Sequence, residues 1–286
     1  MPTVRPVIVT DNYGKSAVRL VKVVRDGPVH HIFDYSVDLR CEGDFDSAHT
    51  AGDNSRVLPT DTMKNSVYAL ARTSSVNPPE EFASRLTTRL LDASPAVSAA
   101  TVDIAAHSWH RSLVQGDPHP TSFERGSSEA RLATATQERG APATYQAGVR
   151  DLVLLRSAGS AFSGYPRDQF TTLKETRDRI LATSVTARWS YDKPLVDFND
   201  TFDDIRQAII AAFSSHPSES VQHTLYGMGE AALAACSEMS EIRLSLPNKH
   251  HILVDLSPFD LDNPNEVFVA TPEPYGLIEA TLRRAP

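Results

Sequence analysis

Three short stretches of the sequence place side chains that could take part in binding or catalysis within a predicted strand, turn or helix. In the first, "SLPNKHHILVDLS" (245–257), the polar side chains of Asn248, Lys249 and His250 interrupt an alternation of apolar residues that is typical of a strand. The proline before them removes a hydrogen-bond donor from that strand. A single inward-facing histidine is usually a packed core residue, but three polar groups at the start of a strand predict the wall of a water-accessible pocket.

The second stretch, "GDNSRVLPTDTMKNSVYA" (52–69), places Thr60 and Asp61 directly after a proline. The ordinary interpretation is a turn or a helix N-cap. Hydroxyl and carboxylate groups at the boundary of an element can also present backbone N–H groups to a ligand, so a binding role stays open.

The third stretch, "AFSGYPRDQFTTLKETRDRILATSV" (161–185), contains Phe162 and ends with Arg179 directly before an apolar run. One interpretation is a short solvated helix over residues 171–179. The other is an arginine that enters a site, where its planar guanidinium forms two parallel hydrogen bonds to a flat anion.

Bulk composition excludes several classes of protein. The net charge of −8 argues against a nucleic-acid-binding protein, and no run of about 18 apolar residues is present to span a membrane. Only Cys41 and Cys236 occur, which excludes a disulfide framework and argues against a structural zinc site of thiolates. The histidines follow no familiar ligand spacing, which predicts no metal site. No signal peptide is visible, and we expect a cytoplasmic protein.

The elements that must position these residues follow from apolar periodicity. Residues 15–25 and 33–39 predict a β-hairpin around the turn Asp26-Gly27-Pro28. Further strands are predicted at 65–73, 96–112, 151–158, 180–191, 241–246 and 249–257. Helices are predicted at 78–94, capped by Asn77, and at 203–215 and 219–236. Residues 116–146 lack periodicity and predict a domain junction.

Each half of the chain therefore shows the order strands, helix, strands. This order predicts an α+β fold built from two copies of one unit, with helices on one face of each sheet. We place the first unit at residues 1–143 and the second at residues 144–286.

Longer motifs add a resemblance to a known family. The sequence strongly resembles urate oxidase (uricase), and the matching segments run in family order along nearly the whole chain. They are "GDNSRVLPTDTMKNSVYALA", "GDPHPTSF", "AFSGYPRDQFTTLKETRDRILATSVTARW", "SVQHTLYGMGEAAL", "LSLPNKHHILVDLSPF" and "NPNEVFVATPEPYGLIEAT".

The resemblance implies the tunnelling fold (T-fold), with two antiparallel-sheet and helix units per chain, assembled as a homotetramer whose sheets close into a barrel. It implies oxidation of urate by O₂ to 5-hydroxyisourate and hydrogen peroxide, without metal or organic cofactor. The terminus "LRRAP" is not a peroxisomal signal, which favours a cytoplasmic enzyme of the bacterial type.

The resemblance also assigns roles to residues of this chain. The implied catalytic proton relay is Lys15, Thr60 and His250. The implied substrate-binding residues are Asp61, Phe162, Leu173, Arg179, Val221, Gln222 and Asn248. Thr60 and Asn248 would hold O₂ and then water, and Thr60 and Asp61 would reach the site from a neighbouring subunit.

Two alternatives belong to other classes. A tunnelling-fold enzyme acting on a pterin, some of which use zinc, predicts a Cys/His ligand set that the sequence does not show. A non-catalytic purine-binding relative would be expected to lack Lys15, Thr60 or His250, and all three are present.

Overall fold

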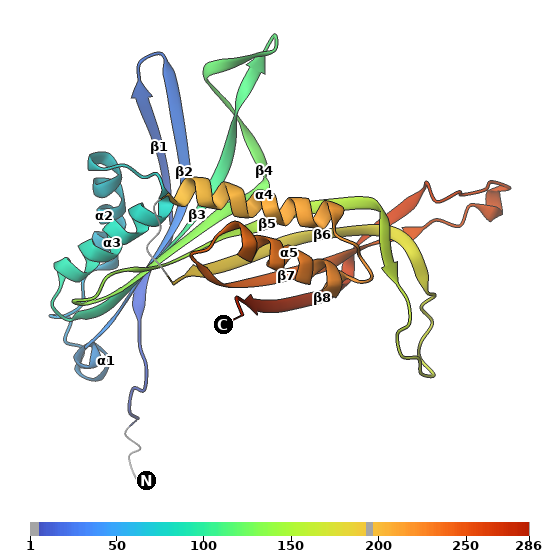
Figure 1. Ribbon diagram of the computed structural model, residues 1–286. Coiled ribbons are helices and arrows are strands. Elements are labelled where there is room, and N and C mark those ends of the chain that lie inside the picture. The colour runs from blue at the N-terminus through green and yellow to red at the C-terminus, as the bar shows by residue number, and fades with distance from the viewer. Residues whose placement is uncertain (1–5, 193–196, 286) are drawn as a thin grey trace. The chain divides into compact units, whose positions relative to one another are not determined.

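The valine-rich residues after Tyr13 form the first of two antiparallel strands joined by the predicted turn. In the computed structural model, which describes residues 6–192 and 197–285, these strands are β1 (Tyr13–Asp26) and β2 (Val29–Gly43) (Figure 1). Gly27 supplies the positive φ of 69° that the turn requires. The predicted hairpin is confirmed. The chain divides into two compact units, residues 1–147 and residues 148–286.

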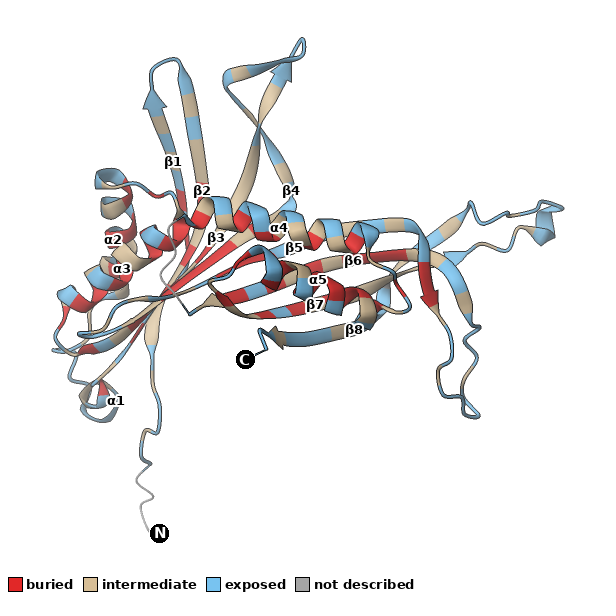
Figure 2. Ribbon diagram, in the orientation of Figure 1, coloured by how far each residue is buried: buried red, intermediate tan, exposed pale blue. Residues whose placement is uncertain are grey.

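The first unit is an antiparallel sheet covered by helices. Its strand order is β1, β2, β3 (Val97–Val114) and β4 (Asp117–Glu138), and its helices are α1 (Asp46–Ala51), α2 (Thr60–Thr73) and α3 (Pro79–Ala93). Alternate residues of β2, such as Val37 and Leu39, are fully buried, as are Phe82 and Leu86 of α3. Buried residues thus recur with a period of two along the strand and of 3.6 along the helix, and they pack together in one core. Figure 2 shows the buried residues on these elements.

The second unit repeats the order of elements. Its strands are β5 (Thr144–Phe162), β6 (Thr176–Tyr191), β7 (Met239–Leu253) and β8 (Phe268–Arg283), adjacent in that order, and a short helix, η1 (Ser257–Phe259), lies between the last two. Helices α4 (Phe198–Ser215) and α5 (Val221–Ala235) lie along one face of the sheet (Figure 1). Both confirm the helices expected near 203–215 and 219–236. The α+β architecture of two sheet-and-helix units is confirmed.

The strand expected at residues 65–73 is wrong, because these residues belong to helix α2. Met63, Val67 and Ala71 are spaced by four residues and are buried together, which is the pattern of one helix face. The valine and tyrosine at positions 67 and 68 favour a strand locally, and packing against the sheet overrides that preference.

Two further expectations about local structure are corrected. Asn77 does not cap α3, since Pro78 is the N-cap residue and no side chain supplies a capping hydrogen bond. Residues 116–146 are mostly strand β4, whose residues pair with β3 from Ala99 to Val114. The composition of these residues did not predict a strand, because the exposed first half of β4 is rich in Gly, Ser and Pro and only its second half is buried.

The strands expected at 241–246 and 249–257 are one strand, β7, which continues through Pro247 to Leu253. The polar cluster is accommodated by a register shift against β8 between Asn248 and His250. Ile252 and Leu253 are 55% and 46% exposed, so this end of the strand is not buried within the single chain.

Candidate active site

In the first unit, β1 and the start of α2 are tied together beside Lys15. The Tyr13 ring packs edge-on against Phe45, with ring centres 4.7 Å apart, and its hydroxyl accepts a hydrogen bond from the Leu58 N–H at 2.8 Å. Because Tyr13 precedes Lys15 by two residues and Leu58 precedes Thr60 by two, this bond holds the first turn of α2 next to β1. The backbone also bulges directly after Lys15, where the register with β2 shifts.

The Asp61 carboxylate, at the start of α2, interacts with two lysines and an amide. Its carboxylate accepts hydrogen bonds from the Lys64 ammonium and, at 2.9 Å, from the Asn65 amide. The Lys64 contact is the main cause that lowers the pKa of Asp61, and the charge of Lys15 contributes to the same direction. The structure therefore brings three predicted site residues of the first unit, Lys15, Thr60 and Asp61, into one neighbourhood.

In the second unit, an aromatic ring and a guanidinium meet at the end of the sheet. Phe162 is the last residue of β5, and the Arg179 guanidinium carbon lies 5.4 Å from the centre of its ring. The ring also stacks on Tyr165, at 4.8 Å and 15°. The Tyr165 hydroxyl donates a 2.7 Å hydrogen bond to the Leu173 carbonyl, which fixes the loop that carries Leu173. Residues 171–175 form no helix, so the alternative of a solvated helix is excluded.

The charge of Arg179 is not neutralised within the described part of the chain. Arg179 continues the β6 row of Leu181, Thr183 and Val185, which faces the helices and is buried. Burial lowers the pKa of Arg179. Its Nε is buried and forms no hydrogen bond to any described residue, and no described carboxylate pairs with it. An unpaired guanidinium at the edge of a core is costly, and an anionic ligand offsets that cost.

Three buried hydroxyl groups attach the start of α5 to the end of β5. Ser160 and Ser218 are 2.9 Å apart at their hydroxyl oxygens, Thr224 donates to Ser218 at 2.8 Å, and the Ala161 N–H donates to the Ser218 carbonyl at 2.6 Å. Ser220 caps the helix by accepting a hydrogen bond from the His223 N–H. These contacts place the first helical residues, Val221 and Gln222, near the end of the strand that carries Phe162.

Strand β7 contributes Asn248 and His250. Asn248 lies directly opposite Thr183 on β6 and continues the buried row of Leu244 and Leu246, so its carboxamide lies on the helix-covered face. His250 follows the register shift and pairs with Thr271 of β8. The polar interruption noted in the sequence therefore lies where the buried apolar row of β7 ends, opposite the polar Thr183 of β6.

The predicted site residues thus form two groups. Lys15, Thr60 and Asp61 belong to the first unit, and the remainder belong to the second unit: Phe162, Leu173, Arg179, Val221, Gln222, Asn248 and His250. The roles of these residues stay predictions. Sequence reasoning did not single out Tyr165, Thr183 or the three hydroxyl residues, because isolated Ser, Thr and Tyr carry no spacing signal.

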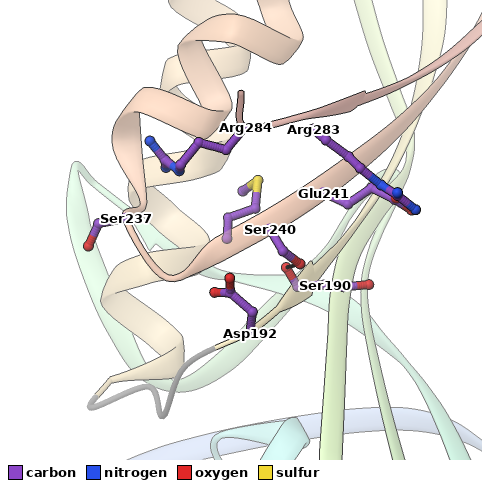
Figure 3. A pocket seen from close by; sticks show the side chains of 8 residues that line it. Ser190, Asp192, Ser237, Ser240, Glu241, Arg283 and Arg284 are labelled. Carbon is purple, nitrogen blue, oxygen red and sulfur yellow. Dashed lines mark hydrogen bonds and ion pairs between the residues drawn. The ribbon is translucent and has the colours of Figure 1, made fainter. Parts of the chain in front are cut away.

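A cavity of about 440 Å³ lies at the other end of β6 and β7 and contains none of these residues (Figure 3). Three of its four charged side chains, those of Glu241, Arg283 and Arg284, already have partners. Arg283 donates to Glu241 at 2.5 Å, and Arg284 donates to the carbonyls of Leu233 and Cys236 at the end of α5. The cavity is therefore bounded by groups that stabilise the fold, and we assign it no part in the chemistry.

The described residues contain no helix that is long and apolar enough to cross a membrane. Within residues 6–192 and 197–285, no group of three or more His, Cys, Asp or Glu side chains is arranged to hold a metal ion.

Comparison with known proteins identifies the family. The uricase family model matches residues 11–136 and 145–279 of this chain. The chain belongs to the uricase family. The uricase of Arthrobacter globiformis is 46% identical over 274 residues, which cover 96% of this chain and 89% of that protein. The uricase of Aspergillus flavus is 36% identical, covering 96% and 95%.

Crystallography of a uricase supports the same assignment at the level of the fold. The crystal structure of the Arthrobacter globiformis uricase superposes with a TM-score of 0.92 at 44% identity, covering 98% of this chain and 96% of that one. The resemblance indicated by the sequence motifs is confirmed. Because uricases are urate oxidases, membership makes this chain an oxidoreductase.

Proposed function

We propose that this uricase-family chain oxidises urate with O₂ and water to 5-hydroxyisourate and hydrogen peroxide, without a metal or organic cofactor. The observation that carries the proposal is the unpaired Arg179 guanidinium beside the Phe162 ring, within a chain of this family. A flat anion with polar edges matches both groups, because a guanidinium can form two parallel hydrogen bonds and a phenyl ring can stack.

In the proposed binding mode, Arg179 and Gln222 hold the edge of the purine and Phe162 stacks on its face. Gln222 both donates and accepts hydrogen bonds, so it can match a ring edge that carries both kinds of group. Leu173 and Val221 supply apolar contacts around the ring. Leu173 is 54% exposed in the free chain and therefore has surface available to a ligand.

In the proposed mechanism, the protein makes urate a strong electron donor. O₂ has a triplet ground state and reacts slowly with closed-shell molecules, so removal of a second proton from urate is needed to raise its electron density. Lys15, Thr60 and His250 carry that proton. Arg179 stabilises the additional negative charge, which is a fixed electrostatic contribution to the transition state.

The oxygen side of the reaction uses Thr60 and Asn248 in our proposal. They hold O₂, which accepts two electrons and two protons and leaves as hydrogen peroxide, and then the water that adds to the oxidised ring. We also propose a homotetramer with sites at subunit interfaces, in which Thr60 and Asp61 of one chain complete the site of another. A cytoplasmic location stays a prediction, which fractionation of cells would test.

The decisive experiment uses the purified full chain after exhaustive treatment with a chelator. In air-saturated buffer we expect urate's ultraviolet absorbance to fall, with one hydrogen peroxide released for each urate consumed. Oxygen-free buffer should stop the reaction. An inactive chelated protein that regains activity when a metal ion is added would contradict the cofactor-free mechanism, and inactivity under both conditions would contradict the function itself.

A further inference from the structure

Thr183 of β6 has a buried hydroxyl group that nothing in the described part of the chain satisfies. The residue is 0% exposed, and its Oγ1 has no hydrogen-bond partner among residues 6–192 and 197–285. Other fully buried hydroxyl groups do have partners: Thr87 donates to the Ser84 carbonyl at 2.8 Å, and Thr224 donates to Ser218 at 2.8 Å. An unsatisfied buried hydroxyl destabilises the fold, so its presence calls for a reason.

The position of Thr183 supplies that reason. On β6, the rows that face the helices are apolar at Val185 and Ala187, and on β7 at Leu244 and Leu246. The next pair along both strands is polar, because Thr183 lies directly opposite Asn248. Residues directly opposite in an antiparallel pair have Cβ atoms about 4.5–5.5 Å apart on the same face. The hydroxyl is therefore within reach of the Asn248 carboxamide after a small rotation of either side chain.

We propose that Thr183 is a positioning residue of the urate oxidase reaction. Its hydroxyl donates a hydrogen bond to Oδ1 of Asn248 when substrate and O₂ occupy the site, which turns the Asn248 N–H groups toward the oxygen species. Hydrogen bonds of this kind are often long in an unliganded enzyme and shorten in the complex. The inference rests on the proposed function, because it acts through the role given there to Asn248.

Removal of the Thr183 hydroxyl should affect the reaction with O₂ and leave the binding of urate nearly unchanged. Thr183→Val replaces the hydroxyl by a methyl group of similar shape, and removal of an unpaired buried hydroxyl leaves the melting temperature unchanged or raises it. Loss of one hydrogen bond should raise the KM for O₂ or lower kcat by roughly three- to tenfold. The KM for urate and the affinity for a non-oxidisable purine analogue should change less than twofold, because Asn248 then still occupies its place.

Two controls isolate the hydroxyl group. Thr183→Ser keeps it and should restore the kinetics of the unmodified enzyme. Thr186→Val makes the same chemical change three residues along β6, on the opposite face and opposite Ser245, and should leave kcat and both KM values unchanged. If Thr183→Val does not fold, Thr183→Ala removes the same hydroxyl and takes its place.

A double-variant cycle with Asn248→Ala tests whether Thr183 acts through Asn248. In the Asn248→Ala background, Thr183→Val should cause no further loss, because the group that it positions is absent. Additive losses would overturn the proposed route, and unchanged kinetics in the single variant would overturn the inference while unmodified enzyme still oxidises urate. An inactive unmodified enzyme would instead be a failure of the proposed function.

Discussion

At the scale of single residues, the contacts of the arginines separate a candidate ligand group from groups that support the fold. Arg139 donates to the carbonyls of Leu91, Ser94 and Val97, and Arg156 donates to the carbonyls of Phe213 and His216. These guanidiniums close the ends of helices and connections. Arg179 has no such partner among the described residues and lies over an aromatic ring, which favours a ligand as its partner.

The prediction for Arg179 concerns binding. Arg179→Lys keeps the charge but removes the planar pair of donors, so we expect the dissociation constant of a non-oxidisable purine analogue to rise at least about tenfold. Isothermal titration calorimetry measures it. Arg177→Lys, two residues earlier and exposed, is the matched control and should bind as the unmodified protein does. Equal affinities for both variants would remove Arg179 from the site.

The prediction for Lys15 concerns turnover. Lys15→Ala removes a member of the proposed proton relay, and general acid–base groups contribute about 10²–10⁴-fold to rates. We expect kcat to fall by about that factor while the affinity for the purine analogue changes little, as steady-state kinetics and titration would show. Lys22→Ala on the same strand, whose ammonium donates to the Ser74 carbonyl, is the control. Parallel loss of binding and turnover would contradict a role in proton transfer.

At the scale of elements, a buried ion pair joins α3 to β4. Glu80 is fully buried, and its carboxylate accepts a 2.8 Å hydrogen bond from Arg131, which is 15% exposed. Burial raises the pKa of Glu80, and the charge of Arg131 opposes that effect. A pair of this kind contributes little net stability, but removal of one partner is costly because the other charge stays buried.

Arg131→Met should lower the free energy of unfolding by about 3–5 kcal/mol at neutral pH. Without the guanidinium, the folded-state pKa of Glu80 rises further above its unfolded value. Protonation of Glu80 then favours the folded state, and this stabilisation is lost as the pH rises through the folded-state pKa. The deficit should therefore shrink between pH 7 and pH 5, measured by urea unfolding. The double variant Glu80→Gln with Arg131→Met should lose less, and a pH-independent deficit would contradict the explanation.

At the scale of the whole molecule, the proposed catalytic residues are divided between two units of similar construction. The proposed assembly makes each site from the first unit of one chain and the second unit of another. Lys15→Ala and Arg179→Ala chains should each be inactive alone. When they are co-expressed, random assembly should leave about one quarter of the sites intact. Recovery of about that share of the activity supports shared sites, whereas no recovery in purified mixed oligomers would place each site within one chain.

Most of the secondary structure could be predicted because its signals are local. The hairpin follows from valine-rich strands around Asp26-Gly27-Pro28, and helices α3, α4 and α5 follow from apolar residues at helical spacing. Two segments could not be predicted in this way. Residues 65–73 are helical because a helix buries Met63, Val67 and Ala71 together against the sheet. Strand β4 forms because its backbone pairs with that of β3 along its length.

The sequence by itself determined the family, the architecture of two α+β units and the candidate residues, because long motifs and apolar periodicity can be recognised in the linear sequence. Only the tertiary structure decided which charges and hydroxyls are satisfied. Arg156 and Arg179 are the same residue type in the chain, yet one is bonded to carbonyls and the other has an unpaired Nε. Thr183 differs from its neighbours only through the strand that lies opposite. Burial and pairing depend on contacts between distant segments, and a linear pattern does not contain them.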